Sequence, residues 1–467
     1  MNRKSLHIVL LTCLAAGIFL WGIEEAGCGL AQLMGWRHSR NAAFALTGHF
    51  INPGPFGCFI ACVMAVAGAW LLKTPILPKP VRLGTRLLAG AVLVMGMLVL
   101  PVSMSRTGWL ALGVALGAEV LRLPRVRVWV RRHQKVIPIS IGLILVLLVG
   151  AFLLKPDSAI GRLHIWRVEC RAIAERPLTG AGPGMFAWAY GEAQEAFFRD
   201  NLETVSPTVV RVAGCPEFAF NEYLGAGVEY GLPGLLLAVV LVVAALVVLY
   251  RRNSPFAAGL TAWALFAFAS YPLSEPRSRI LGGVLILAAV VTGVLGHRKL
   301  HLSGFLPLFA AVLLAGWVGF RGVPGQTDRH EHEILYRQGY ALQQEGRFAE
   351  SSAVLERGAK LSCDPMFEVI LGRNAEALGE VDKAEALYEK AHYMVPSRLY
   401  PLVRQMRLQI RQGRDKDALR TARQIALMPV NDRHAGMVRL REESMATLDS
   451  LQAVTNASAG HAGTTLR

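Results

Sequence analysis

Charged side chains are scarce in this 467-residue sequence: they make up 18% of it, whereas apolar residues make up 53%. An ordinary soluble domain carries about 25% charged residues, so the composition excludes a wholly soluble protein. It also excludes an intrinsically disordered chain, which requires low hydrophobicity together with high net charge. The mean hydropathy of +0.39 therefore predicts extensive contact with a bilayer.

Acidic residues are especially few in the apolar first two-thirds of the chain. Residues 1–327 hold 29 basic and 14 acidic residues, whereas residues 328–467 hold 20 basic and 19 acidic ones. A nucleic-acid-binding surface would need the basic excess on a folded soluble domain. Here it falls between apolar runs, as in the cytoplasmic loops of membrane proteins. We therefore interpret the net charge of +16 as a signal of membrane orientation and predict no nucleic-acid partner.

The seven cysteines lack the spacing of a metal site, and no metal or cofactor is predicted. Cys58 and Cys62 lie in an apolar run, where packing inside a helix is expected. Cys170 and Cys215 fall in one expected external loop, and an oxidising compartment would allow them to form a disulfide.

Nine apolar stretches are long enough to cross a hydrocarbon core of about 30 Å as helices. They are residues 5–23, 56–72, 87–104, 107–122, 136–154, 231–250, 256–273, 280–296 and 303–320. The first follows two basic residues, as in a signal peptide. It lacks a small-residue cleavage site, so we expect a membrane helix there. The fold predicted for residues 1–322 is an all-α, multi-pass membrane bundle.

Every second connection between these stretches carries Lys or Arg and no acidic residue. These connections, with the N-terminus, are residues 1–4, 73–86, 122–135, 251–255 and 297–302. The positive-inside rule makes them cytoplasmic, with the chain after the last span outside. We therefore expect external loops at 24–55 and 155–230. Because long loops are uncommon in compact folds unless functional, we expect short amphipathic helices and a function in the second one.

A repeat of 33 and 34 residues marks the C-terminal part, where Gly346, Gly379 and Gly413 recur. Small residues follow each glycine by five positions, at Ser351, Ala384 and Ala418. This period is typical of tetratricopeptide repeats, which stack helix pairs into a solenoid that binds protein or peptide. We expect such repeats over residues 330–435 and a disordered tail over residues 450–467.

Two external segments carry polar residues that could bind an anion. Arg106 interrupts two apolar runs, where it either extends toward the head groups or serves a function. Arg162 precedes a glycine-rich turn with Gly180 and Gly182, whose backbone could approach a phosphate or sugar closely. A nucleotide site is excluded because the turn faces away from the cytoplasm, and a tight structural turn is the alternative.

A third segment gathers acidic and amide groups where the chain re-enters the bilayer. Glu217, Asn221 and Glu222 lie there, on the same predicted face as Arg106 and Arg162. Buried acidic groups are costly unless they are paired, so pairing with these arginines is one interpretation. Ordinary charges at a helix end are the other.

The order of these segments resembles the O-antigen ligase/polymerase superfamily of bacterial envelope glycosyltransferases. The matching stretches are TGHFINPGPFG (47–57), SRTGWLALG (105–113), GRLHIW…RPLTGAGPGMF (161–186) and FNEYLGAGVEYGLPG (220–234). The resemblance covers roughly residues 45–300, and tetratricopeptide tails also occur in that family.

The resemblance implies a metal-independent enzyme in the bacterial inner membrane. It would transfer a polyprenyl-diphosphate-linked glycan to lipid A-core, a growing glycan or a protein at the periplasmic face. The family's diphosphate-binding arginines would correspond to Arg106 and Arg162, and we place Asn221, Gly180 and Gly182 with them. Guanidinium groups match phosphate oxygens and keep their charge at any pH.

The acceptor hydroxyl also needs a general base. The family's histidine falls at Phe220, which cannot accept a proton. Glu222, Glu217 and His164 are the candidates for this role, and we favour Glu222. A second hypothesis is a non-catalytic membrane scaffold that recruits envelope-assembly proteins through its repeats. A transporter is disfavoured because charged residues are missing from span centres.

Overall fold

A computed structural model describes residues 3–73, 77–135, 156–295, 328–429 and 435–464, with positions 138, 142 and 150. Within these ranges the regular structure is helical and contains no strand, as the all-α prediction requires. The chain divides into two compact units. Unit 1 comprises residues 1–154, 220–226 and 233–323, and unit 2 comprises residues 155–219, 227–232 and 324–467.

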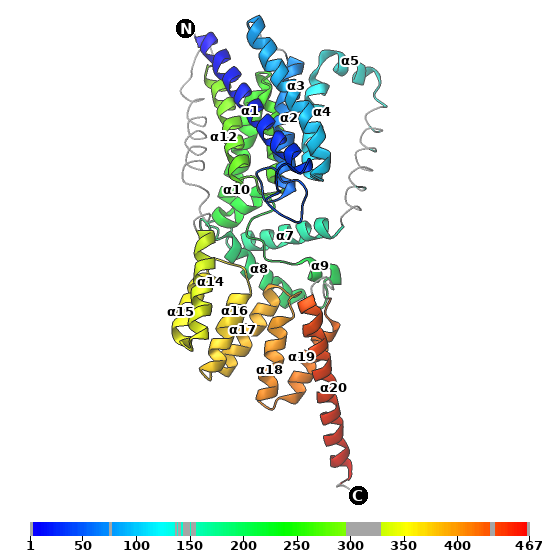
Figure 1. The fold of residues 1–467 in the computed structure, drawn as a ribbon, viewed down its shortest axis with the longest axis vertical. Helices are drawn as coiled ribbons and strands as arrows, with labels where there is room; N and C mark the ends of the chain where they lie inside the picture. The colour runs from blue at the N-terminus through cyan, green and yellow to red at the C-terminus, as the bar shows by residue number, and fades with distance from the viewer. Residues whose placement is uncertain are drawn as a thin grey trace. The chain divides into compact units, whose positions relative to one another are not determined.

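Unit 1 is a bundle of helices, most of them apolar, and its first helices are drawn in blue in Figure 1. Its helices are α1 (Arg3–Leu33), α2 (Pro53–Lys73), α3 (Lys79–Val102), α4 (Arg106–Arg122), α5 (Pro124–Arg132), α11 (Phe256–Ala269), α12 (Pro276–Leu295) and most of α10 (Glu222–Arg251). Helix α2 occupies the centre, with fifteen of its 21 residues buried. A helix that is apolar on all sides is stable only when neighbours surround it.

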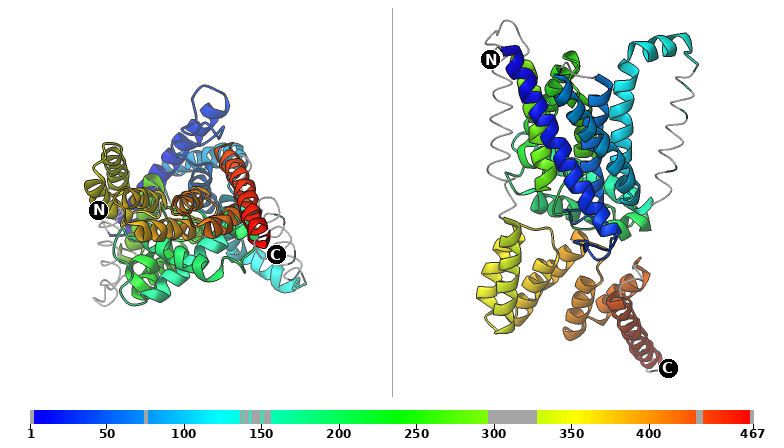
Figure 2. Two further views of the ribbon diagram at one scale, coloured as in Figure 1. Left: turned by 90° about the horizontal axis from the view of Figure 1, so that it is seen from below. Right: turned by 45° about the horizontal axis from the view of Figure 1, so that its top comes forward.

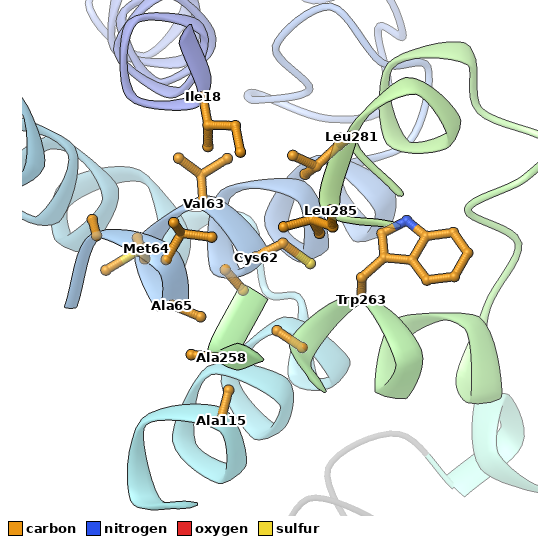
Figure 3. Packing of buried hydrophobic residues seen from close by; sticks show 14 of the residues in the cluster. Ile18, Cys62, Val63, Met64, Ala65, Ala115, Ala258, Trp263, Leu281 and Leu285 are labelled. Carbon is orange, nitrogen blue, oxygen red and sulfur yellow. The ribbon is translucent and has the colours of Figure 1, made fainter. Parts of the chain in front are cut away.

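Figure 3 shows how the neighbours meet α2. Cys62, Val63 and Met64 of α2 pack among side chains of α1, α4, α11 and α12, including Ile18 and Leu285. Cys62 is fully buried in this cluster, which confirms the packing interpretation for that cysteine.

Among the residues that the structure describes, five helices are long and apolar enough to cross a membrane. They are Leu6–Leu33, Pro53–Lys73, Lys79–Val102, Glu222–Arg251 and Pro276–Val294. Exposed apolar side chains in the second half of α10, such as Val240 and Val243, fit contact with lipid. Unit 1 thus has the character of a multi-pass membrane protein.

The other four expected spans have different outcomes. The stretches at 107–122 and 256–273 correspond to shorter helices, α4 of 17 residues and α11 of 14. Helix α11 ends at Ala269 because Ser270 is extended and two prolines follow, at 272 and 276. The stretch at 303–320 and nearly all of that at 136–154 lie outside the described residues.

Unit 2 is built from helices that mostly have 20 residues or fewer. They are α7 (Pro156–Glu175), α8 (Phe186–Asn201), α9 (Pro207–Val212), α14 (Asp328–Gln344), α15 (Phe348–Ala359), α16 (Met366–Ala377), α17 (Val381–Met394), α18 (Tyr400–Arg411), α19 (Asp415–Leu427) and α20 (Ala435–Thr464). The first three confirm the short helices expected in the long loop.

Helices α14 to α19 form three consecutive pairs that lie side by side in Figures 1 and 2. Gly346, Gly379 and Gly413 join the members of each pair with φ of 78°, 80° and 68°, the left-handed conformation that ends helices. The small residues that follow each glycine by five positions are buried between the paired helices. Helix α20 continues through residue 464 and so includes most of the segment 450–467.

Candidate active site

Arg106 begins helix α4 at one end of unit 1. The Oγ of Ser105 accepts a hydrogen bond from the N–H of Gly108 at 3.3 Å and donates one to the carbonyl of Gly54 at 2.9 Å. The start of α4 is thereby fixed beside the start of α2. Arg106 is half-buried there, at the helix end that favours anions.

Asn221 caps helix α10, and Glu222 is the first residue of that helix. The Oδ1 of Asn221 accepts from the N–H groups of Tyr223 and Leu224 at 3.0 and 3.2 Å, and the side chain is buried. The Oε1 of Glu222 accepts from the N–H of Leu273 at 2.7 Å. Both predicted site residues therefore help to position the start of α10, whereas Glu217 is exposed.

The connection between α11 and α12 brings further segments to the same end of unit 1. The Phe220 and Tyr271 rings meet edge to face with centroids 5.2 Å apart. The Tyr271 hydroxyl accepts a hydrogen bond from Asn52 Nδ2 at 3.4 Å. Three of the quoted motifs, at 47–57, 105–113 and 220–234, thus converge here.

Three of the predicted cytoplasmic segments, 73–86, 122–135 and 251–255, meet at the opposite end of α2. Lys73 Nζ lies 2.8 Å from the buried Glu119 carboxylate and donates to the carbonyl of Ser254 at 2.9 Å. Arg122 donates to the carbonyl of Tyr250 at 2.8 Å. A 21-residue helix is about 30 Å long, so the two sets of segments are separated by roughly a bilayer core.

A charged group that the sequence did not suggest lies beside the 47–57 motif. Glu24 and Glu25 lie on α1, and Arg277 on α12 approaches them at 2.9 and 2.6 Å. The Nδ1 of His49 lies 3.1 Å from Oε2 of Glu25, whose side chain is completely buried.

The ligand atoms of Glu24, Glu25 and His49 lie within 4.8 Å of one another, close enough to hold a metal ion. Arg277 already places a positive charge against both carboxylates. Because that charge would repel a cation, these residues fit a divalent ion poorly.

In unit 2, Arg162 and His164 lie on α7. Arg162 is half-buried, one turn before Trp166. His164 is buried, and its Nε2 lies 3.0 Å from the Oε1 of Gln194. Burial lowers the pKa of His164, against the opposing effect of this hydrogen bond. The ring is neutral and enclosed, as expected for a structural histidine.

Gln194 links three parts of unit 2. Its Oε1 accepts from the Tyr190 hydroxyl at 2.7 Å, and its Nε2 donates to the carbonyls of Gly214 and Met394. The loop helices and the repeat helices are therefore fixed to each other by a buried amide, which is costly to remove.

The glycine-rich turn packs against the segment 228–232. Gly180 has φ of 66°, and a Cβ atom there would lie 2.4 Å from the carbonyl carbon of Glu229. The N–H of Ala181 donates to Val228 O at 2.8 Å, and that of Gly182 donates to Glu229 O at 3.0 Å. The Oε1 of Glu229 accepts from the N–H of Gly184 at 3.2 Å. The turn thus uses its glycines for close backbone packing.

A disulfide joins Cys215 to Cys363, with Cα atoms 5.5 Å apart. The pairing of Cys215 with Cys170 was therefore wrong, and Cys170 is an exposed free thiol on α7. Sequence proximity could not identify the partner, because the two cysteines are 148 positions apart.

Residues 90–239 match the family model described as O-antigen ligase. Over these residues the chain is similar to O-antigen ligases, and the similarity indicates membrane glycan transfer of the ligase or polymerase type. The matched segment covers about a third of the chain. A search of curated proteins found no match.

The O-antigen ligase segment contains all the site residues that the sequence predicted. It begins within α3 and ends within α10, so it includes Arg106, Arg162 and Glu222. The structure brings Arg106, Asn221 and Glu222 to one end of unit 1. Arg162, His164 and the glycine turn belong to unit 2.

The group missed by sequence reasoning lies outside the O-antigen ligase segment. Glu24 and Glu25 form an acidic pair near the end of an otherwise apolar stretch, and His49 lies inside the 47–57 motif. These two signals were present in the sequence, but nothing in it showed that the three side chains meet.

Proposed function

We propose that this protein transfers a polyprenyl-diphosphate-linked glycan to lipid A-core, a growing glycan or a protein. The match over residues 90–239 supports the proposal, because it indicates membrane glycan transfer of the ligase or polymerase type and the matched segment contains both arginines. The proposed location is the bacterial inner membrane, with the N-terminus cytoplasmic and the C-terminal unit periplasmic. Three of the connections that carry Lys or Arg and no acidic residue meet at one end of α2. This grouping supports that orientation.

The Cys215–Cys363 disulfide supports a periplasmic location for the C-terminal unit. Disulfides form and persist in oxidising compartments such as the periplasm and are rare in the cytosol. The cysteines belong to the long loop and the repeat helices, both of which the positive-inside rule places outside.

Arg106 and Arg162 bind the donor diphosphate in this proposal. Guanidinium groups form paired hydrogen bonds with phosphate oxygens and stabilise the charge that grows as the diphosphate leaves. Arginine can do this without a metal ion, so we propose metal-independent transfer. Asn221, Gly180 and Gly182 support the site by fixing the start of α10 and the turn after α7.

The acceptor hydroxyl loses its proton during transfer and therefore requires a base. Of the three groups predicted for this role, Glu222 lies at the same end of unit 1 as Arg106. Its Oε1 is already bound by the N–H of Leu273, while His164 is enclosed and Glu217 is exposed.

We further propose that helices α14 to α19 are tetratricopeptide repeats. The glycine at each pair's turn and the buried small residues support this assignment. Part of their surface already packs on α8, where Gly191 lies against Cys363. An intramolecular role of this kind favours an enzyme over a scaffold that recruits partners, although a further protein partner can still use the remaining surface.

A glycan and glycoprotein profile of a strain lacking the protein tests this function. Loss of long glycan chains with intact single-unit capping of lipid A-core would indicate a polymerase. Loss of capping would indicate a ligase, and loss of protein glycosylation would indicate an oligosaccharyltransferase. Unchanged glycans of all three kinds would overturn the proposal.

A further inference from the structure

His49 is held in the geometry of a carboxylate-oriented imidazole. Its Nδ1 lies 3.1 Å from Oε2 of Glu25, and its backbone N–H donates to Oε1 of the same carboxylate at 2.7 Å. Glu24 Oε1 lies 3.4 Å from the same ring nitrogen. A carboxylate at Nδ1 fixes the proton there, which leaves the lone pair of Nε2 available as a proton acceptor.

The backbone around His49 is fixed from helix α1. The Oε1 of Gln32 accepts from the N–H groups of Thr47 and Gly48 at 2.9 and 2.8 Å, and its Nε2 donates to Gly48 O at 2.9 Å. Gly48 has φ of 58°, and a Cβ there would lie 2.3 Å from Glu25 Oε1. Only glycine allows the loop to approach Glu25 this closely, so the ring position is well defined.

Charged side chains lie on the Nδ1 side of the ring. Glu24 and Glu25 lie 3.4 and 3.1 Å from Nδ1, and Arg277 pairs with both carboxylates. Among the described residues, Nε2 of His49 has no hydrogen-bond partner. The His49 side chain is 12% exposed.

His49 lies at the same end of unit 1 as Arg106 and Glu222, which belong to the segment that matches the O-antigen ligase model. Asn52, three residues later, contacts Tyr271, which packs on Phe220. The carbonyl of Gly54 accepts the hydrogen bond from Ser105 that positions the start of α4. Contacts within unit 1 thus link the imidazole to both other polar groups.

We propose that His49 is the general base of glycan transfer and that Glu25 is its positioning residue. This rests on the proposed function. The acceptor hydroxyl gives its proton to His49 Nε2 as its oxygen forms a bond to the anomeric carbon of the donor sugar. The bond between that carbon and the diphosphate oxygen breaks, and its electron pair leaves with the polyprenyl diphosphate. The imidazolium then releases the proton to water.

A purely structural role for the group predicts different results. In that case the ring only helps to hold the loop between α1 and α2, and a free imidazole in solution could not replace it. In a catalytic role, a small base can occupy the space left by a truncated side chain. Chemical rescue therefore separates the two roles.

The experiment uses full-length protein in native membranes, with a polyprenyl-diphosphate-linked oligosaccharide as donor. Release of polyprenyl diphosphate is measured, since this readout does not depend on which acceptor is used. We expect His49→Gln to lower kcat about 10²- to 10⁴-fold, with the KM for the donor changed less than about threefold. Imidazole should restore part of the rate to His49→Ala.

Three further variants complete the test. His38→Gln, at an exposed histidine of the same loop, should leave the rate unchanged. Glu222→Gln tests the other base candidate at this end of unit 1, and its amide oxygen can still accept from the N–H of Leu273. Glu25→Gln should lower kcat with little change in the KM for the donor, because the amide no longer fixes the proton at Nδ1 of His49.

Parent-like release by His49→Gln would overturn the proposal. So would a loss in His49→Ala that imidazole does not restore, or a large loss in Glu222→Gln with normal His49 variants. If the parent protein itself releases no polyprenyl diphosphate, the proposed function fails, and the role of His49 fails with it.

Discussion

Cys215 and Cys363 are joined by a disulfide that ties the loop after α9 to the connection between α15 and α16. A cross-link across so long a stretch of chain restricts the unfolded state strongly. The disulfide also joins the repeat helices to the helices of the long loop. Unit 2 therefore contains segments that precede and segments that follow α10, the fourth long apolar helix, in the sequence.

Replacing either cysteine of this pair should destabilise unit 2. Cys363→Ser should lower the free energy of unfolding by about 2–5 kcal/mol, because the loop constraint is lost. Thermal unfolding and the mobility of the protein with and without reductant would measure this. Cys170→Ser is the control and should change neither quantity; a mobility change in that variant would show that the pairing is different.

Arg106→Ala and Arg162→Ala should each lower glycan transfer at least about 10²-fold, because the leaving diphosphate loses a charged donor. Lysine at either position should restore only part of the rate, since it cannot form the paired hydrogen bonds of a guanidinium. Transfer assays with membranes containing equal amounts of each protein would measure this. Arg86→Ala, an exposed arginine of a predicted cytoplasmic segment, is the control. Full transfer by both alanine variants would remove these arginines from the site.

Gly180→Ala should destabilise the protein by about 2 kcal/mol or more. Its φ of 66° is strained for alanine, and the added Cβ would meet the backbone of Glu229, which cannot move aside like a flexible side chain. Gly214→Ala is the matched control, because a Cβ there meets no atom within 4 Å. Similar thermal unfolding of the two variants would contradict the close packing of the turn on residues 228–232.

His392 should make the protein less stable as the pH falls. Burial lowers its pKa from 6.5 to about 4, and its Nε2 lies 3.2 Å from Gln424. Between pH 6.5 and 4 the unfolded chain takes up a proton that the folded chain does not. The free energy of unfolding therefore falls by as much as about 1.4 kcal/mol for each unit of decreasing pH.

Unfolding of the parent and of His392→Gln at pH 7 and pH 5 would measure this contribution. We expect a smaller loss on acidification in the variant. The exposed His38→Gln should behave like the parent. Equal losses in all three proteins would show that His392 is not buried in its neutral form.

The sequence by itself determined the helical membrane character, the sites of the tight turns and the 33- to 34-residue repeat. These features follow from local patterns, since a bilayer selects apolar runs by length and a helix pair selects glycine at its turn. The tertiary structure alone decided which groups meet. Asn221 caps helix α10, and the buried His164 contacts Gln194. Cys215 pairs with a cysteine that lies 148 positions away. The contact of His49 with Glu25 likewise joins a loop to the preceding helix, and only the folded backbone brings those two side chains within hydrogen-bond distance.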